Sequence, residues 1–179
     1  MLLIHSDLWG PSNISNVTSS KWSISFIDNH TRICWVYLLK KKIWSKKYFK
    51  KFNVMINTQF QTKIQNFCIY NGTEYFNSIP RPYLREHDII HQSSCIATLQ
   101  QNGILERKNC HLLEVVWFLM FTTNVLKYFL GEVILIASYL INRMPPRVLQ
   151  YQTPIEVLKN HYPNIRLVSS FPPKKKKLL

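Results

Sequence analysis

The spacing of the apolar residues changes near residue 40, and this change limits the folds that the chain can adopt. Before it, residues 21–28 (K-W-S-I-S-F-I-D) and 32–39 (R-I-C-W-V-Y-L-L) alternate as strands around a short turn, which predicts an antiparallel hairpin. After it, the apolar residues of 44–60 fall on one helical face. Residues 1–11 form an earlier apolar strand that a Gly-Pro pair ends. The first third of the chain is therefore predicted to be three strands followed by a helix.

The rest of the chain alternates between strands and helices. Its pattern predicts strands at 64–70 and 88–92, a weak helix at 79–87, an apolar helix at 128–142 and a capped helix from Thr153-Pro154. Three sequential strands followed by this alternation predict an α/β fold, in which helices flank a mixed sheet.

The stretch from Ile89 to Glu114 combines a short strand, a polar turn at Gln101-Asn102-Gly103 and a helix that begins near Ile104. We therefore expect Glu106 in the first turn of that helix. An acid in this position is favoured by the helix dipole, so by itself Glu106 is better explained as a solvated helix-start residue than as a functional one.

The chain is strongly basic, with 23 Lys and Arg against 9 Asp and Glu and a net charge of +14. This balance indicates a polyanionic partner, either nucleic acid or an anionic membrane surface. The four cysteines are scattered without a C-x-x-C pair, which argues against a zinc site or a disulfide framework. The longest apolar run, 128–141, contains Glu132 and is short for a membrane span, so we expect a buried or interface helix there.

Two of the few acids stand where a nuclease-like metal site would need them. Asp7 lies on the first strand and Glu106 on the late helix. Such sites use two Mg²⁺ ions roughly 4 Å apart, held by two or three convergent carboxylates. A third acid is expected near the end of the strand at 64–70, and Tyr70 stands there instead.

Over about residues 3–160 the chain resembles the integrase catalytic core of copia-type long-terminal-repeat retrotransposons, within the retroviral integrase superfamily. Each matching segment is short, but all of them follow in the same order. They are H-S-D-L-W-G-P (5–11), F-I-D-N-H-T-R (26–32), W-V-Y-L-L-K (35–40), N-G-T-E-Y (71–75), I-I-H-Q-S-S-C (89–95), Q-Q-N-G-I-L-E-R-K-N (100–109), H-L-L-E (111–114), Y-L-I-N-R-M-P (139–145) and T-P-I-E-V-L (153–158).

This resemblance implies a ribonuclease H-like fold with a five-stranded mixed sheet, and an active site of Asp, Asp and Glu with 35 residues between the last two. Asp7 matches the first position and Glu106 the third. Counting back across residues 71–105 reaches Tyr70, in Y-N-G where the family has D-N-G. A neutral, bulky phenol is a poor Mg²⁺ ligand. The chain is therefore predicted to be a degenerate copy, in which binding of Mg²⁺ or Mn²⁺ is weakened or lost and no DNA strands are joined.

The family also implies DNA contacts for the basic residues. Arg107 and Lys108 adjoin Glu106, and such contacts would position DNA without reading its sequence. Lys46 and Lys50 belong to a dense lysine cluster over 40–51, for which a solvated helix face is an equally good explanation. The aromatic stretch 117–121 is predicted to be core, with a dimer face or a misfolding liability as the alternatives.

We expect one integrase-like domain over 3–160 and an unpatterned basic tail over 161–179. The function implied by the family is DNA integration in the nucleus, by a magnesium-dependent strand-transferase and endonuclease that directs a DNA 3′-hydroxyl at a target phosphodiester. The alternative is a non-enzymatic, basic nucleic-acid-binding remnant of a transposable element. DNA is the expected partner, a homo-oligomer is left open, and membrane-surface binding is the least favoured class.

Overall fold

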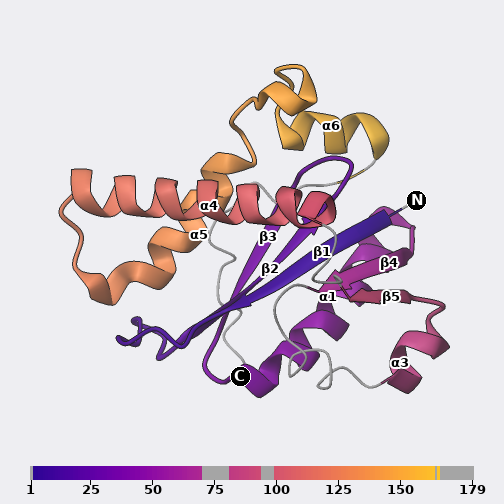
Figure 1. Cartoon of the computed structure of the whole chain (residues 1–179), viewed down its shortest axis with the longest axis horizontal. Coiled ribbons are helices and arrows are strands. Elements are labelled where there is room, and N and C mark those ends of the chain that lie inside the picture. Colours follow the sequence, from indigo (N-terminus) through magenta and orange to yellow (C-terminus); the bar gives the residue numbers. More distant parts are fainter. Residues whose placement is uncertain (1, 70–80, 94–98, 164, 166–179) are drawn as a thin grey trace.

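The structure, a computed structural model, describes residues 2–69, 81–93, 99–163 and 165, without the side chains of 93, 99–102 and 104–106 (Figure 1). The strands are β1 (Leu2–Trp9), β2 (Trp22–Asp28), β3 (Cys34–Leu39), β4 (Ile64–Ile69) and β5 (Ile90–Ser93). The α-helices are α1 (Ser45–Phe60), α3 (Arg81–Glu86), α4 (Leu99–Thr122), α5 (Leu130–Ile141) and α6 (Pro154–His161). Three 3₁₀ turns join them: η1 (Lys42–Trp44), η2 (Lys127–Phe129) and η3 (Arg147–Leu149).

The five strands form one mixed sheet in the order β3-β2-β1-β4-β5. The predicted hairpin is confirmed, since β2 and β3 pair antiparallel, with Phe26 opposite Trp35. β1 lies at the centre, antiparallel to β2 and parallel to β4. β5 continues the sheet, parallel to β4. The predicted α/β fold with a mixed five-stranded sheet is thus confirmed.

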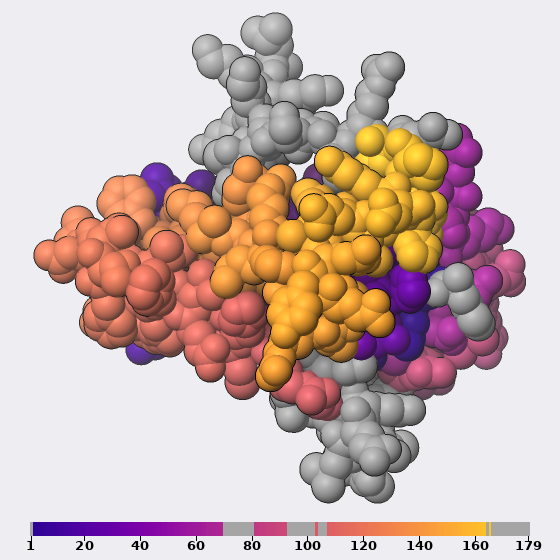
Figure 2. All heavy atoms as spheres, turned by 90° about the horizontal axis from the view of Figure 1, so that it is seen from above, coloured from indigo at the N-terminus to yellow at the C-terminus, as the bar shows by residue number. Residues whose placement is uncertain are grey.

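The two faces of the sheet are covered by different helices. α1 covers one face, and α4 and α5 lie on the other (Figure 1). Seen from above, α4, α5 and α6 spread over most of that second side of the molecule (Figure 2). Because successive side chains of a strand point to opposite faces, Ile4 packs on the α1 side while Asp7 points toward α4.

Aromatic rings fill the core between the sheet and α1. Phe26 of β2 stacks on Phe52 of α1, with ring centroids 4.2 Å apart and planes 7° apart. Trp35 meets the edge of Phe52 at 5.2 Å, and Phe49 lies 4.3 Å from Phe67 of β4. This packing explains why the helical apolar stripe of 44–60 forms α1, since its aromatic side chains complete the core.

Glycine is required where β1 ends. Gly10 has a φ of +129°, and a Cβ there would lie 2.6 Å from the carbonyl oxygen of Lys21. An L side chain would be strained in this conformation and would also clash with the backbone beside β2. Gly10 therefore lets the chain leave β1 directly after Trp9.

The helix that carries Glu106 starts earlier than expected. α4 begins at Leu99, so Gln101-Asn102-Gly103 lies inside the helix and Glu106 falls in its second turn. The expectation of a polar turn followed by a helix at 104 is therefore wrong. Asn and Gly disfavour helix only by about 0.5–1 kcal/mol each. The guanidinium of Arg107 also lies along this turn, where its Nε donates to the carbonyl of Gly103 at 2.7 Å.

The aromatic stretch 117–121 is not core. Trp117, Phe118 and Phe121 are 50%, 65% and 77% exposed, whereas Met120 packs against α5 together with Val116. The second half of α4 extends beyond the sheet with α5 as its main neighbour, so only one face of the helix is covered (Figure 1). The expectation that the whole stretch is buried is wrong, because Met120 lies on the face of α4 that packs in the cluster with α5, whereas Trp117, Phe118 and Phe121 lie on other faces of the helix.

The C-terminal helix begins with the predicted capping box. Thr153 accepts from the backbone N–H of Glu156, and the Glu156 carboxylate accepts from the Thr153 N–H. The fold continues past residue 160, because Tyr162 packs edge-on against Phe60 at 5.2 Å. Residues 166–179, which contain most of the expected basic tail, lie outside the described residues.

Within the described part of the chain, none of the helices combines the length and the apolar character that crossing a membrane requires.

Replacing Phe52 by Ala should lower the free energy of unfolding by about 3–5 kcal/mol, since it removes a fully buried ring and leaves a cavity. Chemical denaturation of the purified chain measures this difference. Phe121→Ala makes the same chemical change at an exposed position of α4 and should shift stability by no more than about 0.5 kcal/mol. Equal losses in both variants would show that the ring of Phe52 is not in the core.

Candidate active site

Asp7 is the acid at the centre of the candidate site. It lies near the end of β1, on the sheet face covered by α4, and only 8% of it is exposed. Its neighbour across the sheet is Ser25 of β2. Burial of an ionised carboxylate is unfavourable unless hydrogen bonds replace those lost to water. The hydrogen-bond donors around Asp7 therefore affect whether its carboxyl group is ionised.

Three N–H groups donate to the Asp7 carboxylate. Oδ1 accepts from the backbone N–H of Leu8 at 2.8 Å. Oδ2 accepts from the indole Nε1 of Trp9, at the short distance of 2.5 Å, and from the side-chain amide Nδ2 of Asn109 at 2.8 Å. Both oxygens are thus engaged within the chain, and the bond to Asn109 fastens α4 to the central strand.

Burial and hydrogen bonding act on Asp7 in opposite directions. Burial is the larger effect and raises the pKa of the carboxyl above its ordinary value of 3.8. The donors Trp9, Leu8 and Asn109 each favour the ionised form and lower the pKa. The net result is a raised pKa, which is the consequence expected for a carboxylate that has lost most of its contact with water.

Glu106 and Tyr70 are the two other positions of the expected triad. Glu106 lies one helical turn before Asn109 in α4, and its side chain is outside the described residues. Tyr70 is itself outside the described residues and follows directly on Ile69, the last residue of β4. Ile69 pairs with Ser6, the neighbour of Asp7, so the strand that leads to position 70 runs beside the strand that holds Asp7.

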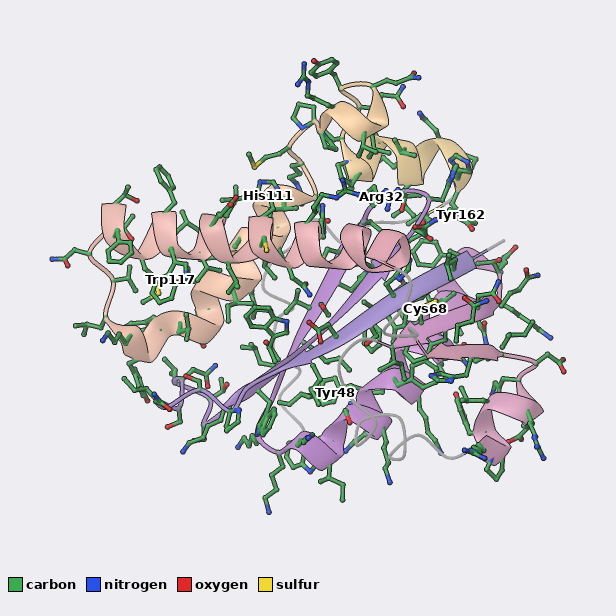
Figure 3. All side chains as sticks on the ribbon, viewed as in Figure 1. Arg32, Tyr48, Cys68, His111, Trp117 and Tyr162 are labelled. Carbon is green, nitrogen blue, oxygen red and sulfur yellow. The ribbon has the colours of Figure 1, made fainter. Side chains whose placement is uncertain are left out.

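Three cationic side chains, those of Arg32, Arg107 and Lys108, lie on the side of the sheet that α4 covers. Arg32, in the turn between β2 and β3, interacts electrostatically with Asp28 and Arg107, and Lys108 interacts with Arg32 and Cys34. Arg32 lies beside the first half of α4 (Figure 3). Burial is the main cause that lowers the pKa of both Arg32 and Lys108. Arg107 is exposed, whereas Lys108 is half-buried against the hairpin.

The turn that holds Arg32 is built by Asp28. Its Oδ2 accepts from the backbone N–H of Thr31 at 2.9 Å and from the Thr31 hydroxyl at 2.7 Å. These bonds show that Asp28 caps the turn. The next residue, Asn29, lies 3.4 Å from His5 Nε2, so this turn also contacts the central strand.

Lys46 and Lys50 are not brought to Asp7. They lie on α1, on the opposite face of the sheet, where Tyr48 marks the helix in Figure 3. There a shallow open groove is lined by Lys46, Lys47, Lys50, Lys51 and Val54. The ammonium of Lys50 lies 4.7 Å from the centroid of the Tyr83 ring. The basic surface of α1 and the cations near Asp7 are therefore two separate features.

The sequence predictions did not include Trp9, Asn109 or Arg32 in the site. Two of the three could have been found from spacing. Trp9 is two residues after Asp7 and so lies on the same face of a strand, and Asn109 is three residues after Glu106 in the same helix. Arg32 comes close to α4 only because the β2–β3 hairpin packs beside that helix. Spacing within the sequence does not predict this packing.

The described residues do not form the two-Mg²⁺ site that the resemblance implies. No group of three or more His, Cys, Asp or Glu side chains gathers among them. Mg²⁺ prefers ionised carboxylate oxygens, and Asp7 offers one carboxylate whose oxygens already accept from three donors. The phenol of Tyr70 supplies no carboxylate at the second position, so the donor set that can be named does not fit two Mg²⁺ ions.

Comparison with known proteins gives close matches among transposon polyproteins. The chain is 34% identical over 168 residues to the retrovirus-related Pol polyprotein from transposon RE2 of Arabidopsis thaliana, which covers 94% of this chain and 11% of that protein. It is 34% identical over 158 residues to the corresponding polyprotein from transposon TNT 1-94 of Nicotiana tabacum, covering 88% of this chain and 12% of the relative. The chain thus spans about a tenth of these relatives, and no family model matches it.

Among solved structures, the fold is similar to the HTLV-2 integrase catalytic core domain in complex with magnesium. The TM-score is 0.58 at 15% identity, and the match covers 87% of this chain and 94% of that one. Trimeric and dimeric forms of that domain match equally well. At this identity the likeness establishes the fold, which agrees with the ribonuclease H-like prediction.

Replacing Asn109 by Ala should raise the pKa of Asp7 further, because one donor to the ionised carboxylate is lost while the carboxyl stays largely buried. The pH titration of the Asp7 carboxyl carbon by NMR measures the shift. Asn160→Ala, an amide removed from the exposed surface of α6, should leave the Asp7 titration unchanged.

The same pKa has a consequence for stability. Because it is higher in the folded than in the unfolded chain, the contribution of Asp7 to stability is fully present below 3.8 and is lost as the pH rises through the folded-state value. We therefore compare the free energy of unfolding of Asp7→Asn with that of the wild type. The difference should shift in favour of the variant as the pH rises from 3.8 through the folded-state pKa of Asp7, and it should stay constant at higher pH. The opposite trend would mean that the hydrogen bonds outweigh burial.

Proposed function

Because the chain belongs to the integrase catalytic cores of retrotransposon Pol polyproteins, we propose that it is a copy of a DNA strand-transferase domain that joins no DNA strands. The reaction of the family is the attack of a DNA 3′-hydroxyl on a target phosphodiester. Mg²⁺, when bound in such a site, activates the attacking oxygen and stabilises the leaving oxygen. This chemistry needs two or three carboxylates that converge on the metal ions. At one of these positions the chain has a tyrosine where the family has an aspartate.

The observation that carries the proposal is Tyr70, which stands 36 positions before Glu106 where an acid is needed. The arrangement of the strands supports it, because β4 runs parallel to β1 and its last residue, Ile69, pairs with Ser6, the neighbour of Asp7. Glu74 follows four residues later, and ligands must be held within about 0.5 Å of the productive geometry, so its substitution for the lost acid is not expected.

The remaining residues would act on DNA without reacting with it. Asp7 is held in one orientation by Trp9 and Asn109. Arg107 is exposed on α4 next to Glu106, and its charge can neutralise a phosphate close to the site. Lys108 stays in the proposed DNA-binding set, with the smaller exposed part of its side chain available for contact.

A second candidate function is nucleic-acid binding without catalysis. The groove of Lys46, Lys47, Lys50 and Lys51 on α1 favours it, since four adjacent cations can follow a phosphate backbone and do not depend on the acidic positions. This surface faces away from Asp7. DNA held there would lie on the opposite side of the sheet from the degenerate site.

The exposed aromatic face of α4 supports assembly of two copies. Trp117 and Phe121 lie one turn apart with their rings 5.8 Å from each other, and they remain largely open to solvent. An exposed apolar patch of this kind is typical of a protein interface. We include a homo-oligomer, and a nuclear location taken from the role of the family, in the proposed function.

Replacing Tyr70 by Asp should restore strand transfer if the rest of the site is sound, because it returns the missing carboxylate. The assay incubates purified protein with DNA that carries a free 3′-hydroxyl, target DNA and Mn²⁺ or Mg²⁺, and scores joined products. The wild type and Tyr70→Phe should stay at background, and adding Glu106→Gln to Tyr70→Asp should remove the regained activity. Wild-type activity that Glu106→Gln abolishes would contradict the proposal.

For the second function, changing Lys46 and Lys50 together to Gln should reduce the slope of log K against log salt for duplex DNA by about 2, at about 0.9 for each lost phosphate contact. Fluorescence anisotropy over a range of salt concentrations measures this slope. The matched control is Lys127→Gln with Lys159→Gln, two exposed lysines outside the α1 groove, for which the slope should not change. An equal decrease in both double variants would refute a specific role for α1.

A further inference from the structure

Two histidines meet at the junction between the β2–β3 turn and α6. His30 lies in the turn and His161 is the last residue of α6, 131 positions later. Their Nε2 atoms are 2.8 Å apart, and their rings are 4.4 Å apart at an angle of 75°. Both side chains are exposed. Arg32 and Tyr162, which are labelled in Figure 3, are close to them in sequence and mark this junction.

The hydrogen bonds determine which nitrogen has a lone pair. His161 Nδ1 lies 3.0 Å from the carbonyl oxygen of Val157, which can only accept, so Nδ1 must carry the hydrogen. In the neutral ring, His161 Nε2 is then an acceptor, and His30 Nε2 must be the donor across the 2.8 Å contact. A metal-binding histidine has this same arrangement, with one nitrogen held by a carbonyl and the other open.

We propose that His30 and His161 together bind a divalent transition-metal ion that prefers nitrogen ligands, such as Zn²⁺, Ni²⁺ or Cu²⁺. The ion takes the place of the hydrogen between the two rings. The hydrogen on His30 Nε2 passes through solvent to Nδ1 of the same ring, so that each Nε2 gives a lone pair to the metal and no net proton is released. Water completes the coordination.

The geometry requires a small adjustment. Two nitrogens at 2.0–2.1 Å from a tetrahedral Zn²⁺ are roughly 3.3 Å apart, so the Nε2 atoms must separate by about half an ångström. One histidine is on a turn and the other at the end of a helix, where side chains have freedom to move. Their exposure leaves space for the water ligands.

The ligands also select the kind of metal. Imidazole nitrogen suits Zn²⁺, Ni²⁺ and Cu²⁺, whereas Mg²⁺ and Ca²⁺ require oxygen ligands. Among the described residues the pair has no carboxylate or thiolate to form a group of three. The nearest charged residues in sequence are Asp28, Arg32 and Lys159, each two positions away from one of the two histidines. One carboxylate oxygen of Asp28 is engaged with Thr31, and the two cations disfavour weakly bound metal ions. The pair is therefore distinct from the acidic site at Asp7.

Metal bound here would fasten α6 to the turn that contacts the central strand. That turn contains Asn29, which lies 3.4 Å from His5, and Arg32, which interacts with Arg107 of α4. The two elements already share the core, since Leu158 of α6 packs in the same cluster as Ile33. A metal bridge between them should raise the thermal stability of the folded chain by binding it preferentially.

The test is calorimetric titration of the full chain with Zn²⁺ and with Ni²⁺, for the wild type, His30→Gln and His161→Gln. Each substitution should weaken binding at least tenfold and remove the increase in Tm that the metal gives the wild type. His87→Gln is the matched control, because His87 Nδ1 also lies 3.0 Å from a carbonyl, that of Tyr83, in the same i to i+4 arrangement. It should bind like the wild type.

Binding must also survive Glu106→Gln, which separates this site from the acidic one. Unchanged affinity in both His30→Gln and His161→Gln, or loss of binding in Glu106→Gln alone, would overturn the proposal. If a histidine variant fails to fold, NMR of the wild type decides the question. Zn²⁺ should shift the imidazole signals of His30 and His161 and leave those of His87 in place, and the reverse pattern would refute the site.

Discussion

β1 lies at the centre of the sheet, hydrogen-bonded to β2 on one side and to β4 on the other, and the candidate site depends on this position. One side of β1 holds apolar residues against the aromatic core on α1. The other side holds His5 and Asp7 toward α4. Side chains of a strand alternate between the two faces of the sheet. The alternation that turns the apolar residues of β1 into the core therefore also places Asp7 under α4, where it has little contact with water.

That position makes Asp7 sensitive to its neighbours. Its burial disfavours the charged form, and the indole of Trp9, the amide of Asn109 and the backbone of Leu8 together offset part of this effect. A bound cation would have supplied the same compensation, and a second carboxylate would have helped to hold it. With Tyr70 in place of that carboxylate, internal donors are the compensation that the described residues provide.

The strands and helices could be predicted from the local pattern of apolar and polar residues. The predictions were wrong where packing between distant residues determines the start of a helix or the burial of a side chain. Alternating residues gave the hairpin, and the helical stripe gave α1. The start of α4 was misplaced because Asn102 and Gly103 indicate a turn locally yet are tolerated within a helix of 24 residues. Trp117, Phe118 and Phe121 were expected in the core, and their exposure follows from the absence of a second helix beside α4 among the described residues.

By itself, the sequence determined the family and the order of the strands and helices, and it predicted Asp7, Tyr70 and Glu106 as the three positions of the active site. These depend on residue type and spacing, which are properties of the chain before it folds. Only the tertiary structure decided that Asn109 and Trp9 hold Asp7, that Arg32 joins the cations of α4, that the lysines of α1 face away from the site, and that His30 meets His161. Each of these depends on which face of the central sheet an element covers, and that is settled by packing between residues far apart in the sequence.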